Sequence, residues 1–218
     1  VLAPGHSARD TFEMLQKRGV YMEPKSFAVG LRIEHPQEMI NMDLYGEPEN
    51  ELLGAASYKV THKCANGRGV YSFCMCPGGY VVNASSEPER TCVNGMSYSG
   101  RNAANANSAI IVSVTKDDFG GEDALAGMRY QRMLEHKNYM LGNGKIPQQL
   151  FGDYCQNVES SAYGAYASET KGQTVFSNLR GLMSNEMEQS FMQGMAHFAK
   201  IVTGFRSEEH TSELQSLV

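Results

Sequence analysis

A series of short strand-forming segments between residues 27 and 114 most limits the folds open to this chain. Residues 27–34 alternate large apolar side chains with small or charged ones, which is typical of a strand with one buried face. Further runs rich in β-branched and aromatic residues follow at 58–62, 70–76, 80–84, 91–94 and 109–114. Because these segments are short and separated by Gly and Asn turns, they predict a mostly antiparallel sheet.

The first residues predict a strand end and a helix. Val1 to Ala3 have the character of the end of a buried strand, and a Pro-Gly turn follows them. Ser7 is expected to cap a helix over residues 8–18, because a Ser followed three positions later by an acidic residue satisfies free N–H groups there. Gly19 is the expected stop just past the end of this helix.

Three more helices are predicted further along the chain, over residues 37–45, 124–141 and 184–203. The last of them has five apolar residues at helical spacing, which predicts that one face is buried. These residues are Met187, Phe191, Met195, Phe198 and Val202. Residues 142–178 are rich in Gly, Ser and Gln and give no clear prediction.

The predicted order is a strand end and a helix, then a sheet, then helices, which is an α+β arrangement. On this pattern residues 24–120 form a β-rich part and residues 121–205 a helical part, with residues 1–23 as a separate unit. From residue 206 the sequence shares no pattern with the preceding chain. Eleven consecutive residues there resemble the conceptual translation of a sequencing-library adapter, so we expect 206–218 to be a non-native tail.

Composition argues against several classes of protein. Hydrophobic residues make up 41% and charged residues 20% of the chain, as in a folded domain rather than a disordered one. A net charge of −5 argues against general nucleic-acid binding, and no apolar run approaches the roughly 18 residues of a membrane span. Five cysteines, an odd number, suit a reducing cytosol better than a disulfide framework. We therefore expect a soluble cytoplasmic protein that binds neither nucleic acid nor a membrane.

The segment Cys74-Met75-Cys76-Pro77-Gly78-Gly79 is the first candidate site. Residues two apart on a strand share a face, so the two thiols are able to project toward one site. Pro77 ends the strand, and Gly78 and Gly79 let backbone approach a ligand closely. Three interpretations stay open, namely buried structural cysteines, the lining of a cofactor or substrate pocket, and a metal site. A metal site needs further ligands, for which the sequence offers Cys64, Cys92, His62 and His35.

Residues 94–108 form the second candidate site. They contain four Asn, three Ser and Arg101, and no acidic residue. One interpretation is a long loop, since Asn and Gly tolerate left-handed backbone. The other is a set of amide and hydroxyl donors, with one cation, that faces an anionic or carbonyl-rich ligand.

Two further features have plain structural interpretations. His6 stands between Gly5 and Ser7, at a helix N-terminus where α/β proteins often bind anions, although a lone His is more often structural. Arg132 and Glu135 lie three residues apart on the predicted helix over 124–141, which is the spacing of a surface ion pair.

Four blocks of the sequence resemble the bacterial family of uncharacterised FAD-dependent dehydrogenases, a branch of the flavoproteins with two dinucleotide-binding domains. The blocks are APGHSARDTFEML from residue 3, FAVGLRIEHPQ from 27, YKVTHKCANGRGVYSFCMCPGG from 58 and VNGMSYSGRNAANANSAII from 93. The resemblance implies FAD as the cofactor and hydride transfer through the flavin. It also implies a small-molecule substrate, with NAD(P)H or another donor as the electron partner.

The resemblance also implies a place for this chain in an α/β flavoprotein. Residues 1–23 would be a strand–helix remnant of the Rossmann-like FAD-binding domain, and residues 24–205 would be the substrate domain inserted in it. The chain would then be an internal fragment that is inactive alone. It would bind FAD poorly, because it has no glycine-rich phosphate-binding turn.

Site residues follow by resemblance only. The expected cofactor-binding residues are Gly5, His6, Ser7, Cys74, Gly78, Gly79, Asn94 and Arg101. The expected catalytic candidates are Cys76, Asn102 and Asn105, and no metal is expected. The competing hypothesis is a non-enzymatic thiol or zinc-binding module that uses Cys64, Cys74, Cys76 and Cys92.

Overall fold

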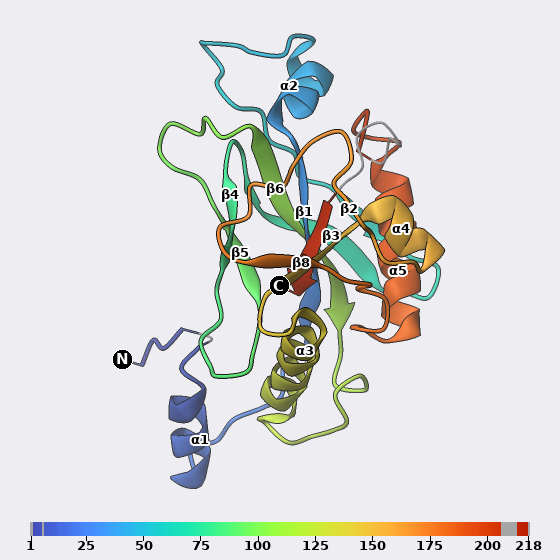
Figure 1. Cartoon of the computed structure of the whole chain (residues 1–218). Coiled ribbons are helices and arrows are strands. Elements are labelled where there is room, and N and C mark those ends of the chain that lie inside the picture. Colours follow the sequence, from blue (N-terminus) through green and yellow to red (C-terminus); the bar gives the residue numbers. More distant parts are fainter. Residues whose placement is uncertain (1, 6, 206–212, 218) are drawn as a thin grey trace.

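The structure is a computed structural model that describes residues 2–5, 7–205 and 213–217 of the chain (Figure 1). A seven-stranded sheet forms its centre. In spatial order its strands are β2 (Thr61–Lys63), β3 (Gly69–Cys76), β6 (Asn105–Val114), β1 (Phe27–Pro36), β9 (Glu213–Leu217), β7 (Ile146–Leu150) and β8 (Thr174–Phe176). All neighbours in the sheet are antiparallel except β7 and β8, so the prediction of a mostly antiparallel sheet is confirmed.

The pairing of β1 with β6 forms the middle of this sheet. The two strands pair over ten residues, from Phe27 opposite Val114 to Pro36 opposite Asn105. They approach closely at Gly30, where a Cβ atom would lie 1.9 Å from the carbonyl oxygen of Ile110. A larger residue at this position would therefore push the two central strands apart.

A second, two-stranded ribbon pairs β4 (Tyr80–Asn83) with β5 (Val93–Met96) and packs on the sheet, in contact with β3 and β6. Helix α5 (Asn185–Phe198) packs against β2, β3 and β6. Four residues of its predicted apolar stripe lie on α5 and are 0% exposed, while the fifth, Val202, is buried beyond the end of the helix, which stops at Phe198 rather than at residue 203. Ser184 caps the helix by accepting a hydrogen bond from the N–H of Met187.

The remaining helices have the following bounds: α1 (Arg9–Lys17), α2 (Gln37–Tyr45), α3 (Ala126–Gly142) and α4 (Phe151–Gln156). The predictions for α2 and α3 are confirmed to within two residues. Strand β7, helix α4 and strand β8 lie in residues 142–178, for which no element was predicted. None of the helices in the described ranges combines the length and the apolar character needed to cross a membrane.

Two predictions for the first residues are wrong. Leu2 and Ala3 are exposed and irregular rather than the end of a buried strand. Ser7 does not cap α1, since the N-cap is Ala8 and no side chain bonds the free N–H groups there. Gly19, with φ of +74°, does end the helix as predicted. A Rossmann-like remnant in residues 1–23 therefore stays a prediction.

Two predictions concern residues outside the described ranges. Val1 and His6 are not described, nor are residues 206–212 and 218. Residues 213–217 form β9, which lies between β1 and β7 and joins them into one sheet. The interpretation of residues 206–218 as a non-native tail stays a prediction.

Candidate functional site

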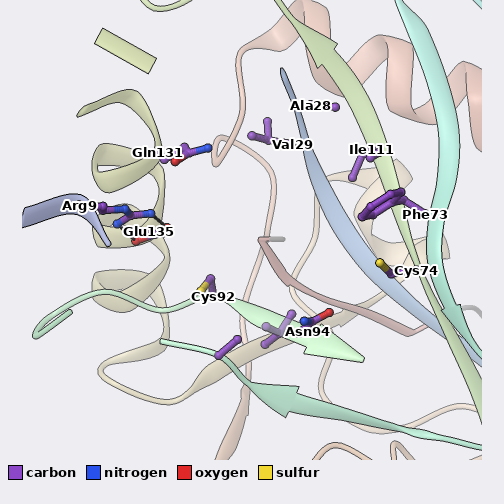
Figure 2. Close-up of a pocket in the computed structure, with 12 residues that line it drawn as sticks. Arg9, Ala28, Val29, Phe73, Cys74, Cys92, Asn94, Ile111, Gln131 and Glu135 are labelled. Carbon is purple, nitrogen blue, oxygen red and sulfur yellow. Dashed lines mark hydrogen bonds and ion pairs between the residues drawn. The ribbon is translucent and has the colours of Figure 1, made fainter. Parts of the chain in front are cut away.

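A cavity of about 360 Å³ lies between the sheet, the β4–β5 ribbon and α3 (Figure 2). Most of its lining is apolar, and Phe73, Val93 and Ile111 contribute to it from three different strands. Polar side chains line it on two sides, with Asn94 on the ribbon and Gln131 and Glu135 on α3, beside Arg9. Such a chamber, apolar with a few placed polar groups, has the form of a small-molecule site.

An ion-pair network that includes Arg9 forms the wall beside α3. Arg9 is only 2% exposed, and its guanidinium donates to Glu135 at 2.5 and 2.8 Å and to Glu87 at 2.6 Å. Arg132 donates to Glu87 and, at 2.5 Å, to Glu13 on α1. The predicted surface pair of Arg132 with Glu135 is therefore wrong. Both residues turn toward α1 and the 84–92 segment, because closer partners lie there.

A second buried arginine, Arg32 on β1, lies behind the opposite wall. Its side chain is 0% exposed and donates to Oδ1 of Asn107 at 2.5 Å and to Oδ1 of Asn94 at 3.2 Å. It also donates to the carbonyl oxygen of Cys74 at 3.2 Å. The space for the guanidinium exists because residue 95 is Gly, where a Cβ atom would lie 2.3 Å from Nη1 of Arg32.

The Cys74–Cys76 segment contains a β-bulge. The register between β3 and β6 shifts between Phe73 and Cys76, and Cys74 has a left-handed φ of +45°. The bulge breaks the alternation of faces, so the two thiols line different hollows. Cys74 lines the cavity described above, whereas Cys76 lines a neighbouring pocket with Met96 and Tyr98. The prediction that the thiols share one site is therefore wrong.

The Cys76 thiol is half-buried, and this burial raises its pKa. The nearby charge of Arg32 opposes the rise without cancelling it. Cys76 therefore keeps its proton at neutral pH, which suits a proton donor better than a thiolate nucleophile.

Gly78 and Gly79 are buried against the chain's own loop rather than open to a ligand. A Cβ atom at Gly78, whose φ is +46°, would lie 1.9 Å from the carbonyl oxygen of Arg101. At Gly79 it would lie 2.4 Å from Oγ of Ser97. The close approach that these glycines permit is thus to residues 96–102, and their contact with a cofactor stays a prediction.

The Asn-rich segment divides between two strands and a loop. Residues 94–96 belong to β5 and residues 105–108 to β6, so the loop spans only 97–104. Arg101, Asn102 and Asn105 line a separate, open polar groove. Asn105 is 3% exposed, and its amide donates to the carbonyl oxygen of Ala167 at 2.9 Å.

The structure therefore does not bring Asn102 and Asn105 together with Asn94. The catalytic role of Asn102 and Asn105 stays a prediction, and these residues lie in the polar groove rather than in the cavity. Gly5 and Ser7 are exposed just before α1, two to four residues from Arg9 in the cavity wall.

The zinc-module hypothesis finds no support in the described ranges. No group of three or more His, Cys, Asp or Glu side chains there is placed to hold a metal. Cys64 lies in the hydrophobic core, where its thiol contacts the carbonyl oxygen of Ser190 at 3.6 Å. All five cysteines are free.

The cysteines should differ strongly in reactivity. Burial raises the pKa of Cys92 to about 11, so about one molecule in a thousand carries the thiolate at pH 8. Cys74 is exposed, and Cys64 is buried. With a limiting alkylating reagent at pH 8, mass spectrometry should find Cys74 modified first and Cys64 and Cys92 last. In 8 M urea these differences should vanish, and equal labelling of Cys92 and Cys74 in the folded chain would contradict the placement of Cys92.

Comparison with known proteins identifies the family of the chain. The chain belongs to the family described as "FAD-dependent protein, C-terminal domain-like", whose model matches residues 26–213. This family is FAD-dependent, which supports FAD as the cofactor. A protein of Clostridium beijerinckii, named only as an uncharacterised protein, is 44% identical over 213 residues, or 96% of this chain. The chain spans 40% of the length of that relative.

Proposed function

We propose that this chain is the substrate-facing domain of an FAD-dependent oxidoreductase, and that the cavity receives the flavin ring together with the substrate. The observation that carries the proposal is the cavity itself, which is apolar and has a free amide donor at Asn94. Membership of an FAD-dependent family is the evidence for FAD as the cofactor. We place the protein in the cytoplasm and assign NAD(P)H or another small donor as its electron partner.

The described residues fit the flavin ring better than the diphosphate of FAD. An apolar wall suits a flat aromatic ring, and the amide of Asn94 suits a ring carbonyl. The N-terminus of α1 is less suitable for a diphosphate, because Asp10 accepts a hydrogen bond there from the N–H of Thr11. The sequence also contains no strand followed by a glycine-rich turn of the kind that binds dinucleotides. We therefore assign diphosphate binding to the part of the longer protein that this chain does not span.

When bound, FAD supplies the acceptor or donor of a hydride. This chain's own residues exclude water and orient the substrate. Phe73, Val93 and Ile111 form the apolar wall. Asn94 donates to a substrate or ring carbonyl, where a fixed hydrogen bond stabilises developing negative charge. The protonated thiol of Cys76 is a candidate proton donor in the adjoining pocket.

Flavin binding to the 218-residue chain tests the proposal. The fluorescence of lumiflavin, which has the flavin ring but no phosphate, should be quenched when it binds. FAD should bind no more than about threefold tighter than lumiflavin, because phosphate contacts are absent. Ala28→Trp, which fills the cavity, should abolish lumiflavin binding. Met133→Trp, at an exposed position on α3, should leave it unchanged.

Two outcomes would overturn the proposal. FAD binding more than tenfold tighter than lumiflavin would place the phosphate site in this chain. In the longer Clostridium beijerinckii relative, normal turnover after the same cavity-filling change would show that the cavity is not the substrate site.

A further inference from the structure

The amide of Asn94 is oriented by two donors that bind the same atom. Nη2 of Arg32 donates to Oδ1 of Asn94 at 3.2 Å, and the N–H of Gly95 donates to it at 2.8 Å. Because only the oxygen of an amide can accept two hydrogen bonds, the opposite atom must be the Nδ2 group. This Nδ2 group donates no hydrogen bond to any of the described residues. Asn94 lines the cavity and is exposed there, so its two N–H donors are available to a ligand.

The charge of Arg32 has no carboxylate bonded to it in the described ranges. Its acceptors are all neutral, namely Oδ1 of Asn107, Oδ1 of Asn94 and the carbonyl oxygen of Cys74. Its Nε atom is buried without a hydrogen-bond partner. A buried charge is screened much less than one in water, so its field extends to the neighbouring wall of the cavity. Asn94 and Cys74, which contact Arg32 directly, form that wall.

The opposite wall of the cavity, formed by α3, offers no unpaired positive charge. Glu135 faces the cavity, but its carboxylate is bound by Arg9 through two hydrogen bonds. This pair offers no unmatched positive charge to a ligand. An anionic group in the cavity would therefore be favoured at Asn94 and not at Glu135.

We propose that the cavity binds a small, mainly apolar carboxylate, whose oxygen accepts a hydrogen bond from Nδ2 of Asn94. Arg32 is a positioning residue that orients and polarises this amide and stabilises the ligand's charge from behind the wall. The inference deepens the proposed function, on which it rests in taking the cavity as the substrate chamber. It names the class of substrate as an apolar acid.

Binding of benzoate and benzamide to the 218-residue chain tests this inference without any flavin. The two probes have the same shape, and only benzoate is charged. Titration calorimetry should give at least about tenfold tighter binding for benzoate, since hydrogen bonds to charged groups are the stronger ones. Addition of benzoate should also shift the Asn94 side-chain NH₂ signals in ¹⁵N NMR spectra, and addition of benzamide should shift them less.

Asn94→Asp separates recognition from a structural role. Asp keeps an oxygen for Arg32 and for the N–H of Gly95, so the melting temperature should not fall. It removes the N–H donors and adds a negative charge, so benzoate affinity should drop more than tenfold. Asn83→Asp is the matched control, because Asn83 also accepts from a backbone N–H on the same ribbon and lies outside the cavity lining. This control should bind benzoate as the original chain does.

Gly95→Ala tests the part played by Arg32. A Cβ atom there would collide with the guanidinium and with Oδ1 of Asn107, so Arg32 must move away from Asn94. The preference for benzoate over benzamide should then shrink, while binding of benzamide stays the same.

Three results would overturn the inference: no benzoate binding up to millimolar concentration, equal affinity for the two probes, or benzoate affinity within twofold of normal in Asn94→Asp. If that variant fails to fold, the NMR comparison on the unaltered chain decides, and unchanged Asn94 signals count against the inference. Lumiflavin binding is measured separately. If benzoate does not bind, the proposed function still stands, and if lumiflavin does not bind, the anion site is judged on the benzoate results alone.

Discussion

Replacing Arg9 with Met will lower the free energy of unfolding by about 3–5 kcal/mol, because it leaves the buried carboxylate of Glu135 without its cation and takes one of two cations from Glu87. Arg9 donates three hydrogen bonds, two to Glu135 and one to Glu87. Glu135 is 8% exposed, so water cannot replace the lost partner cheaply. Because Arg9 belongs to α1, the same change will loosen the attachment of this helix to α3.

Urea denaturation followed by circular dichroism measures the loss, and limited proteolysis in residues 18–26 measures the release of α1. Arg129→Met is the control, because Arg129 pairs with Asp123 at 2.8 Å with both side chains about half exposed. Such surface pairs contribute less than about 1 kcal/mol. An equal loss in the two variants would contradict the role assigned to Arg9.

The same network gives stability a defined dependence on pH. Hydrogen bonds from Arg132, and then from Arg9, lower the pKa of Glu87 to about 2 from its usual 4.5. A carboxylate with a lowered pKa contributes stability that is fully present above pH 4.5 and is lost as the pH falls toward 2. In Arg9→Met the loss of stability on acidification should be smaller than in the original chain, since one of the two cations at Glu87 is gone.

Replacing Phe191 with Ala is the second change with a large expected effect, a loss of about 3–5 kcal/mol. Phe191 is 0% exposed in the middle of α5, and its ring packs edge-on against Tyr154 at 5.6 Å and Phe151 at 6.3 Å. Removing it leaves a cavity between α5 and α4 and also removes these aromatic contacts. Both effects act on the main hydrophobic core, through which α5 packs against β2, β3 and β6.

Thermal unfolding by calorimetry and circular dichroism will detect this loss. Met140→Ala is the control, since Met140 is a large apolar residue on α3 that is 63% exposed. Its removal should change the free energy of unfolding by less than about 0.5 kcal/mol. Similar melting temperatures for the two variants would mean that α5 does not pack as described.

The sequence predicted the elements whose signal is local. The apolar stripe of α5 and the alternation of β1 are each visible within one segment, and both predictions are confirmed. Strand β7 was missed because its centre carries Gln148 and Gln149, which are 2% and 1% exposed. Their buried amides are bonded to residues 158, 163, 178 and 179, which lie far from the strand in sequence. No local pattern distinguishes such a strand from a polar loop.

The candidate site was predicted less well, because its geometry depends on distant segments. Alternation along β1 places Arg32 on a polar face that should meet water. The β4–β5 ribbon covers this face instead, so Arg32 is completely buried. The bulge at Cys74 likewise separates two thiols that simple alternation places together. A charged residue between two large apolar ones in a strand, as Arg32 between Leu31 and Ile33, was the available signal for the site.

Strand β9 has a consequence for how this domain assembles during synthesis. β1 is made before β9 and receives it only when residues 213–217 leave the ribosome, so the contact joins segments that are far apart in the sequence and forms slowly. Until then one edge of β1 and one edge of β7 have unpaired N–H and C=O groups, which attract strands of other molecules. Yield and aggregation on expression will therefore be governed by the last stretch of the sheet to be translated.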